Sequence, residues 1–142
     1  MPSMKILLIA GGWSSEREVS LTGARGMQEA LLKRGHAVTF FDLLENFDEL
    51  LETARQHDFA LINLHGSPGE DGLVQAMLEK AGCPYQGSGP SGSFLALNKA
   101  AAKQIFRMAG LPTADWEFLP VRPAEGWEPR LPWPLFVKTT TG

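Results

Sequence analysis

Short continuous runs of apolar residues alternate, in the first part of the chain, with longer stretches in which apolar residues recur at helical spacing. A continuous apolar run is typical of a parallel strand buried on both faces, whereas apolar residues three or four apart are typical of a helix with one buried face. The runs predict strands at residues 5–10, 37–41 and 59–63 and a short fourth strand that begins at Pro84-Tyr85. The spacing predicts helices from Ser20 to about Arg34, over residues 47–56, and from Asp71-Gly72 to Gly82.

This alternation of strands and helices indicates an α/β fold. Strands joined by crossover helices are parallel, so we expect a doubly wound parallel sheet of at least four strands with helices on both faces. The helix that follows Asp71-Gly72 should place Leu73, Ala76, Met77 and Ala81 on its inner face. The glycine- and serine-rich segment 86–92 ends this domain, which gives an amino-terminal domain over residues 1–89 and a second region over residues 90–142.

The second region begins with a longer apolar pattern. Phe94, Leu97, Ala101, Ile105 and Met108 form one stripe, which predicts a single helix over about residues 91–109 that ends at Gly110-Leu111-Pro112. Residues 114–120 and 135–138 have the pattern of strands, separated by a proline-rich loop.

The composition narrows the class of protein. The chain has 142 residues, is 44% hydrophobic and 20% charged, and has a formal net charge of -3, as expected of a soluble globular protein. We therefore expect no general affinity for nucleic acid or an anionic membrane, and no apolar run approaches the ~18 residues of a membrane span. The single cysteine, Cys83, excludes an internal disulfide and is either a core thiol, which its apolar neighbours favour, or a reactive one. A reducing cytoplasm fits these features.

Two polar, glycine-rich loops follow the first and third predicted strands, at residues 11–21 and 64–72. Loops at the carboxyl ends of parallel strands form the ligand crevice of an open sheet. The first loop carries Glu16 and the second carries His65. A carboxylate and an imidazole at one sheet edge suggest recognition of a small molecule that bears both charges, such as an amino acid.

Each of these features also has a structural interpretation. Gly11-Gly12 suits a tight turn as well as a close approach to a ligand, and it matches neither the dinucleotide fingerprint nor the P-loop. The charge run Glu16-Arg17-Glu18 is also typical of a solvated helix start, and Glu70-Asp71 of a helix cap. A lone histidine such as His65 is often structural. These interpretations weaken when the features are taken together, because all lie at the same predicted edge.

The lysines of the second region are less specific. Lys99 and Lys103 lie on the polar face of the predicted helix, where solvent exposure is the simpler interpretation. Lys138 follows an apolar run and precedes a threonine- and glycine-containing segment, where its charge could neutralise phosphate.

Several long motifs occur in a fixed order: Gly11-Gly12-x-Ser14-x-Glu16-Arg17-Glu18-Val19-Ser20-Leu21, Leu64-His65-Gly66-x-x-Gly69-Glu70-Asp71-Gly72, Gln75-x-x-Leu78-Glu79, Pro84-Tyr85-x-Gly87-Ser88-Gly89, and Asn98-Lys99 followed by Gly110-Leu111-Pro112-Thr113. Together they closely resemble the amino-terminal portion of D-alanine–D-alanine ligases, members of the ATP-grasp superfamily. The resemblance covers Lys5 to about Lys138.

The resemblance implies a Rossmann-like domain that precedes an ATP-grasp domain, of which this chain contains the first elements. It implies use of ATP and magnesium to join two D-alanines in the cytoplasm for peptidoglycan precursor synthesis. Glu16 matches the residue that holds the ammonium of the first D-alanine, and His65 the residue near its carboxylate, with Gly66 beside it in the substrate loop. Lys99 and Lys138 match two lysines that contact the nucleotide. The family's metal ligands lie outside this chain, and a homodimer is left open.

Two departures from the family pattern qualify this expectation. Asn98 replaces the usual aspartate before the lysine, and Lys138 is followed by Thr139-Thr140-Thr141-Gly142 instead of a proline and a Gly-Ser-Ser-type loop. We therefore expect the chain to be an amino-terminal fragment that cannot make the dipeptide alone. Its surface around Phe118, Trp127, Trp133 and Phe136 should be exposed or buried by self-association. The alternatives are a complete non-catalytic binding module and a ligase whose acceptor is D-lactate or D-serine.

Overall fold

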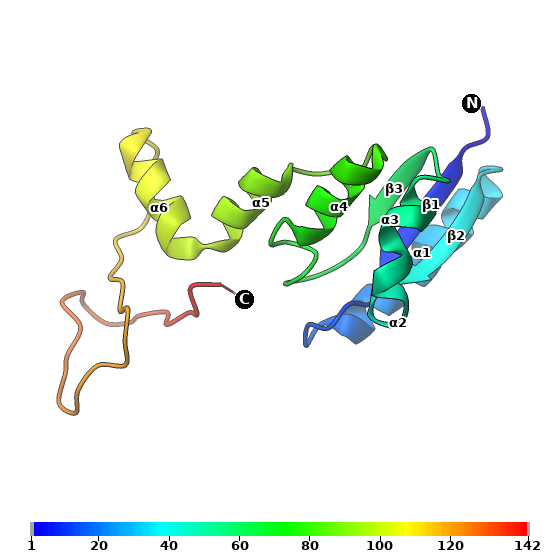
Figure 1. The fold of residues 1–142 in the computed structure, drawn as a ribbon. Helices are drawn as coiled ribbons and strands as arrows, with labels where there is room; N and C mark the ends of the chain where they lie inside the picture. Colours follow the sequence, from blue (N-terminus) through cyan, green and yellow to red (C-terminus); the bar gives the residue numbers. More distant parts are fainter. Residues whose placement is uncertain (1, 142) are drawn as a thin grey trace. The chain divides into compact units, whose positions relative to one another are not determined.

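The apolar strand β1 (Lys5–Ala10) is the centre of the sheet, as its unbroken hydrophobic run predicts. In the computed structural model, which describes residues 2–141, β1 lies between β2 (Ala37–Asp42) and β3 (Phe59–Ile62), and both run parallel to it (Figure 1). Every residue of β1 after Lys5 is buried, because helices cover both faces of the strand. The predicted α/β fold with a parallel sheet is confirmed.

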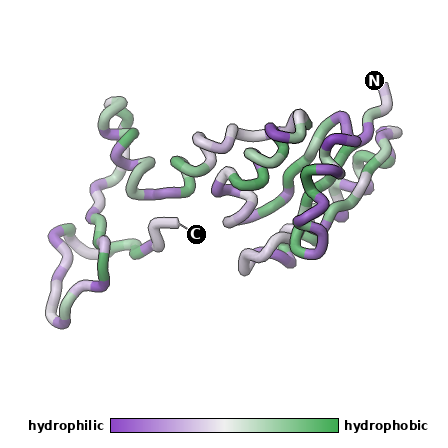
Figure 2. Tube along the Cα trace, in the orientation of Figure 1, coloured by the Kyte–Doolittle hydropathy of each residue, from purple (hydrophilic) through white to green (hydrophobic). Residues whose placement is uncertain are grey.

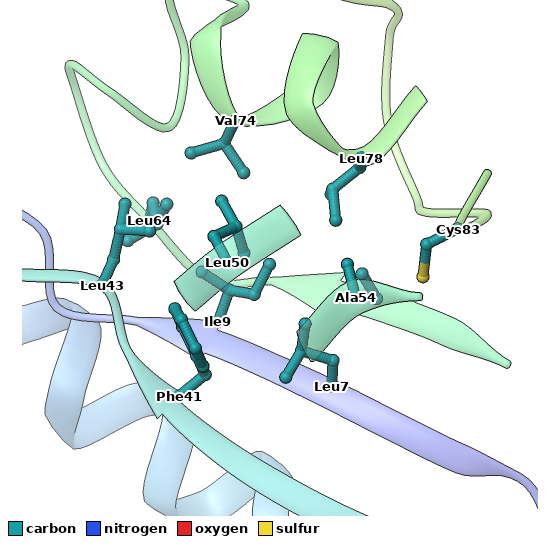
Figure 3. Packing of buried hydrophobic residues seen from close by; sticks show 11 residues of the cluster. Leu7, Ile9, Phe41, Leu43, Leu50, Ala54, Leu64, Val74, Leu78 and Cys83 are labelled. Carbon is teal, nitrogen blue, oxygen red and sulfur yellow. The ribbon is translucent and has the colours of Figure 1, made fainter. Parts of the chain in front are cut away.

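Buried side chains form one cluster on each face of the sheet. Successive residues of a strand point to opposite faces, so Leu7 and Ile9 belong to the larger cluster, and Leu8 belongs to the smaller one beside Ala24 of α1 (Arg17–Lys33). The larger cluster is covered by α3 (Leu50–Ala54) and α4 (Leu73–Ala81). Figure 3 labels all the buried residues of this cluster except Ala60: Leu7, Ile9, Phe41, Leu43, Leu50, Ala54, Leu64, Val74, Leu78 and Cys83.

The helix α1 begins at Arg17, before the Ser20 from which the sequence predicts it. The Ser20 hydroxyl bonds to groups outside the helix, and the Ser20 backbone N–H donates to the Glu16 carbonyl at 3.1 Å. The first turn of α1 therefore includes Arg17, Glu18 and Val19, which the sequence pattern placed in the loop after β1.

The helix predicted over residues 47–56 is a 3₁₀ turn (Phe47–Glu49) followed by the short helix α3 (Leu50–Ala54). A further short helix that the sequence did not predict, α2 (Leu43–Asn46), precedes them. The Asp42 side chain accepts a hydrogen bond from the Leu44 N–H at 3.1 Å, which starts α2 directly after β2.

The inner face of α4 also differs from the prediction. Val74 and Leu78 are fully buried in the larger cluster, whereas Leu73 is exposed. Ala76 is exposed too, while Met77 and Ala81 pack against the cluster's margin. The predicted inner face of α4 is therefore rotated about the helix axis relative to the observed one, because the prediction used Leu73 as the first buried position.

The fourth strand expected at Pro84-Tyr85 is only a single parallel bridge between Ala60 and Tyr85, and the sheet has three strands. The Gln86 side chain explains why the pairing stops there. Its amide oxygen accepts from the Ile62 N–H at 2.9 Å, and its amide nitrogen donates to the Ile62 carbonyl at 2.6 Å. A side chain thus occupies the β3 groups to which the main chain of a fourth strand would bind.

The chain divides into two compact units, Met1–Phe94 and Leu95–Gly142. The division between domains expected after residue 89 stays a prediction. Hydrophobic residues occur in both units (Figure 2), but none of the described residues from 95 onward is buried. Across residues 2–141, no helix combines the length and hydrophobicity that crossing a membrane requires.

The long helix predicted over residues 91–109 is broken at Asn98 into α5 (Pro90–Leu97) and α6 (Lys99–Met108). Asn98 has an extended backbone, and its side chain accepts from the Ala101 N–H at 3.0 Å. Asparagine is a strong helix cap, so it starts a new helix although the apolar stripe continues past it. The end of the helix before Gly110 agrees with the prediction.

The strands predicted at residues 114–120 and 135–138 are absent, and both segments are irregular. Strands need hydrogen-bonding partners, and none of the described segments pairs with these. The aromatic residues expected on an exposed surface are all exposed: Phe118, Trp127, Trp133 and Phe136.

Candidate functional site

The loop after β1 is shaped by Gly11, whose φ of +79° is a left-handed conformation that glycine adopts without strain. A methyl group at this position would lie 2.4 Å from Arg17 Nη1 and 2.6 Å from Asp42 Oδ1. The Gly11 N–H donates to the Ser20 hydroxyl at 2.8 Å. This amide is therefore used within the protein, which favours the tight-turn interpretation for Gly11.

Arg17 ties the start of α1 to the end of β2. Its guanidinium donates to both carboxylate oxygens of Asp42, each at 2.7 Å, and weakly to the Gly12 carbonyl at 3.4 Å. The bonds between the two side chains hold the pKa of the Asp42 carboxyl below its usual range and raise the pKa of Arg17. In the charge run Glu16-Arg17-Glu18, the arginine thus has a structural role, because it forms an ion pair with Asp42.

Glu16 directly precedes α1 and is exposed. Its N–H donates to the Ser14 hydroxyl at 3.2 Å, and its side chain does not cap the helix. Among residues 2–141 its carboxylate has no hydrogen-bond or ion-pair partner. Glu16 thus lies exposed at the helix start, as the structural interpretation of the charge run expects, and its charge is also available to a ligand.

The second loop places His65 and Gly66 after β3, both half-buried. The Gly66 carbonyl accepts from the Glu70 N–H at 2.8 Å, which closes the loop. Asp71 accepts from the Leu73 N–H at 3.0 Å and also from the Ser67 hydroxyl. Asp71 thus accepts from the first N–H of α4, but the N-cap residue of this helix is Gly72, one position after the predicted one.

Gly69 and Gln75 fix the far side of this loop. A methyl group on Gly69 would lie 2.2 Å from Leu64 Cβ, so only glycine fits here. The buried Gln75 side chain donates to the Gly69 carbonyl at 2.6 Å. Sequence reasoning gave neither residue a role in the loop, although both belong to the quoted motifs.

The two loops lie against each other, as expected for loops that leave neighbouring parallel strands. A methyl group on Gly66 would touch Ser14 Cβ at 3.4 Å, and one on Gly12 would touch Leu64 Cδ2 at 3.3 Å. The loops that carry Glu16 and His65 are therefore brought together at one edge of the sheet.

Lys99 and Lys138 belong to the second unit. Lys99 is the first residue of α6, and its N–H donates to the Thr140 carbonyl at 2.9 Å, which joins the helix start to the segment after Lys138. Lys138 is exposed. Lys103, expected in solvent, instead donates to the Thr113 hydroxyl at 3.0 Å and the Ala114 carbonyl at 2.9 Å.

No group of three or more histidine, cysteine, aspartate or glutamate side chains within residues 2–141 is placed to hold a metal ion. Cys83 is buried, and this burial raises the pKa of its thiol. The core interpretation of Cys83 is therefore supported.

The chain is strongly similar to known ligases, although no family model matches it. It is 76% identical over 139 residues to a D-alanine–D-alanine ligase of Desulfovibrio desulfuricans and 57% identical over 139 residues to one of Lawsonia intracellularis. These matches cover 98% of the chain but only 45% and 46% of the relatives. The chain thus spans about half the length of the curated relatives that it matches.

Solved structures give the same result. The fold is similar to a D-alanine–D-alanine ligase from Bacillus anthracis complexed with ATP, with a TM-score of 0.76 and 38% identity over 87% of this chain and 43% of that one. A second structure of the Bacillus anthracis ligase has a TM-score of 0.73 and 42% identity, over 81% of this chain and 38% of that one.

Proposed function

Because the chain belongs to the D-alanine–D-alanine ligase family, matching the amino-terminal portion of its members, we propose that it forms the first substrate-binding part of an enzyme that joins two D-alanines. ATP phosphorylates the carboxylate of the first D-alanine and leaves as ADP. The amine of the second D-alanine attacks the acyl phosphate, so that a peptide bond forms and phosphate leaves. The dipeptide enters peptidoglycan precursor synthesis in the cytoplasm. No observation favours a non-catalytic module or another acceptor.

In this proposal the Glu16 carboxylate holds the ammonium group of the first D-alanine. A charge-assisted hydrogen bond between these groups is stronger than a neutral one. What supports the assignment is that the carboxylate is exposed and has no partner among the described residues, while neighbouring Arg17 is held by Asp42.

In the same proposal, His65 and Gly66 lie near the carboxylate of the first D-alanine. The observation that carries this proposal is the contact between the two loops, in which Gly66 packs on Ser14 and Gly12 packs on Leu64. This contact puts an anionic and an imidazole side chain on adjoining loops, as recognition of a zwitterion requires.

Lys99 and Lys138 contribute positive charge to the nucleotide site. Lysine suits phosphate as a compact cation, and the bond from the Lys99 N–H to the Thr140 carbonyl supports a shared site for the two segments. Among residues 2–141, no group of histidine, cysteine or acidic side chains is placed to hold magnesium, and in this proposal its ligands lie in the part of the enzyme outside this chain.

The test uses a completed ligase, in which this chain replaces the matching amino-terminal part of the Desulfovibrio desulfuricans relative. Glu16→Gln should reduce kcat/KM for the first D-alanine roughly 10- to 150-fold, the equivalent of losing ~1.5–3 kcal/mol of a charged hydrogen bond. The KM for ATP should hardly change. Glu18→Gln is the matched control, because Glu18 is also an exposed acid and lies only two positions away, in the first turn of α1.

Equal D-alanine kinetics in the Glu16→Gln and Glu18→Gln ligases would contradict the role of Glu16. The 142-residue chain alone should release no phosphate from ATP in the presence of D-alanine. Turnover near that of the completed ligase would contradict the proposal that this chain forms only one part of the enzyme. Sedimentation of the completed ligase tests whether it is a homodimer.

A further inference from the structure

Ser20 is a fully buried polar residue whose hydroxyl joins two strands of the sheet. The hydroxyl accepts from the Gly11 N–H at 2.8 Å, just after β1, and donates to the Asn63 carbonyl, just after β3. Its own N–H donates to the Glu16 carbonyl at 3.1 Å. One residue therefore contacts the main chain on both sides of the first loop and at the root of the second.

Asn63 also binds Ser20 through its own side chain. Its side-chain amide donates to the Ser20 carbonyl at 2.7 Å, and its N–H donates to the Ile9 carbonyl at 2.8 Å. Each residue thus uses its side chain to bind the main chain of the other, which fixes α1 against the end of β3. Only Leu64 separates Asn63 from His65.

We propose that Ser20 and Asn63 are positioning residues for the first D-alanine, which set the spacing between the Glu16 and His65 loops. This inference rests on the proposed function. Neither side chain is assigned a contact with substrate: Ser20 is inaccessible, and the Asn63 side-chain amide is committed to the Ser20 carbonyl.

These hydrogen bonds should affect the position of the substrate-binding residues as well as the stability of the fold. Glu16 directly precedes α1, and its carbonyl accepts from the Ser20 N–H, so a shift of α1 relative to β3 moves the Glu16 carboxylate relative to His65. Misplacement of a substrate-binding group by about 1 Å can reduce a rate 100-fold. Loss of the hydrogen bonds between Ser20 and Asn63 should therefore weaken the binding of the first D-alanine more than the binding of ATP.

The experiment compares Ser20→Ala, Asn63→Ala and Glu16→Gln in the completed ligase, with Ser15→Ala as a control because Ser15 is an exposed serine of the same loop. Measured well below the unfolding temperature, Ser20→Ala should raise the KM for the first D-alanine about 10- to 100-fold and leave the KM for ATP within about twofold. Adding Glu16→Gln to Ser20→Ala should cost less than Glu16→Gln costs alone, because coupled residues are not additive.

Gly23→Ala provides a variant that removes no polar group. A methyl group on Gly23 would lie 3.1 Å from the Asn63 amide nitrogen, whereas one on Gly26 of the same helix would meet nothing within 4 Å. We expect Gly23→Ala to raise the KM for the first D-alanine and Gly26→Ala to leave it unchanged. This pair keeps the test decisive if Ser20→Ala does not fold.

Two results are distinguishable. If Glu16→Gln impairs use of D-alanine but Ser20→Ala, Asn63→Ala and Gly23→Ala change only the unfolding temperature, the positioning role is wrong and the proposed function stands. If Glu16→Gln itself leaves D-alanine kinetics unchanged, the proposed function fails first.

Discussion

Replacement of Gly69 by alanine should destabilise the first unit through one steric contact. The added Cβ would lie 2.2 Å from Leu64 Cβ and 3.2 Å from the Leu64 Cα and carbonyl carbon. Carbon atoms in favourable contact are about 3.5–4.0 Å apart, so the two Cβ atoms would have to separate by roughly 1.3 Å. Neither Cβ can move by a rotamer change, because both are fixed by the backbone.

The free energy of unfolding should therefore fall by about 3 kcal/mol, the upper part of the usual range for overpacking. Gly69 is not among the described glycines with positive φ, so the cost is steric and does not come from a forbidden backbone conformation. Gly26→Ala is the matched control: it lies inside α1 with nothing within 4 Å of the added methyl group. It should increase stability by about 0.5–1 kcal/mol, because alanine favours helix over glycine.

Urea unfolding followed by circular dichroism measures both effects as shifts of the midpoint at a constant slope. The variants should shift the midpoint in opposite directions. A Gly69→Ala protein as stable as the unmodified chain, with the same slope, would refute the steric reasoning.

Three further outcomes follow from burial and charge. Leu7→Ala, at a fully buried position, should lower the unfolding free energy by about 2–5 kcal/mol, whereas Leu32→Ala at an exposed position should change it little; equal effects in urea titrations would be inconsistent with the described core. Because the hydrogen bonds from Arg17 hold the pKa of Asp42 below its usual range, the pair stabilises the folded state above the pKa of an aspartate in the unfolded chain, and this stability is lost as the pH falls through the lower, folded-state pKa. Asp42→Asn should therefore be less stable near neutral pH and less sensitive to acid below about pH 4, and parallel pH-stability profiles would argue against the pair. Cys83, whose pKa is raised by burial, should react with a thiol reagent at neutral pH only after urea is added, and fast labelling of the folded chain would show that it is accessible.

Features governed by local pattern could be predicted from the sequence. The continuous run at Lys5–Ala10 defined the central strand with its observed bounds, and the alternation with helices indicated the parallel sheet. The same topology was enough to place the loops that carry Glu16 and His65 at one edge, since neighbouring parallel strands end on the same side.

Features that depend on distant partners could not be predicted in this way. The Ser20 hydroxyl donates to the carbonyl of Asn63, 43 positions away, a partner that no local pattern indicates. Gln86 ends the sheet by binding Ile62 with a side chain, an arrangement that no strand propensity describes. Asparagine is a residue type that commonly caps helices, but the continuous apolar stripe around Asn98 favoured one long helix, so the break there was not predicted. The roles of Glu16, His65, Gly66, Lys99 and Lys138 remain predictions.

The buried core ends early in the sequence, and this affects how the protein is made. The last residue of the larger cluster is Cys83, and no described residue from 95 onward is buried. Ribosomes add about 5–20 residues per second, and amino-terminal domains generally fold first. All three strands and both core clusters are therefore available for folding while the end of the chain is still being synthesised, so the proposed D-alanine loops can assemble before the segment that carries Lys138 is made.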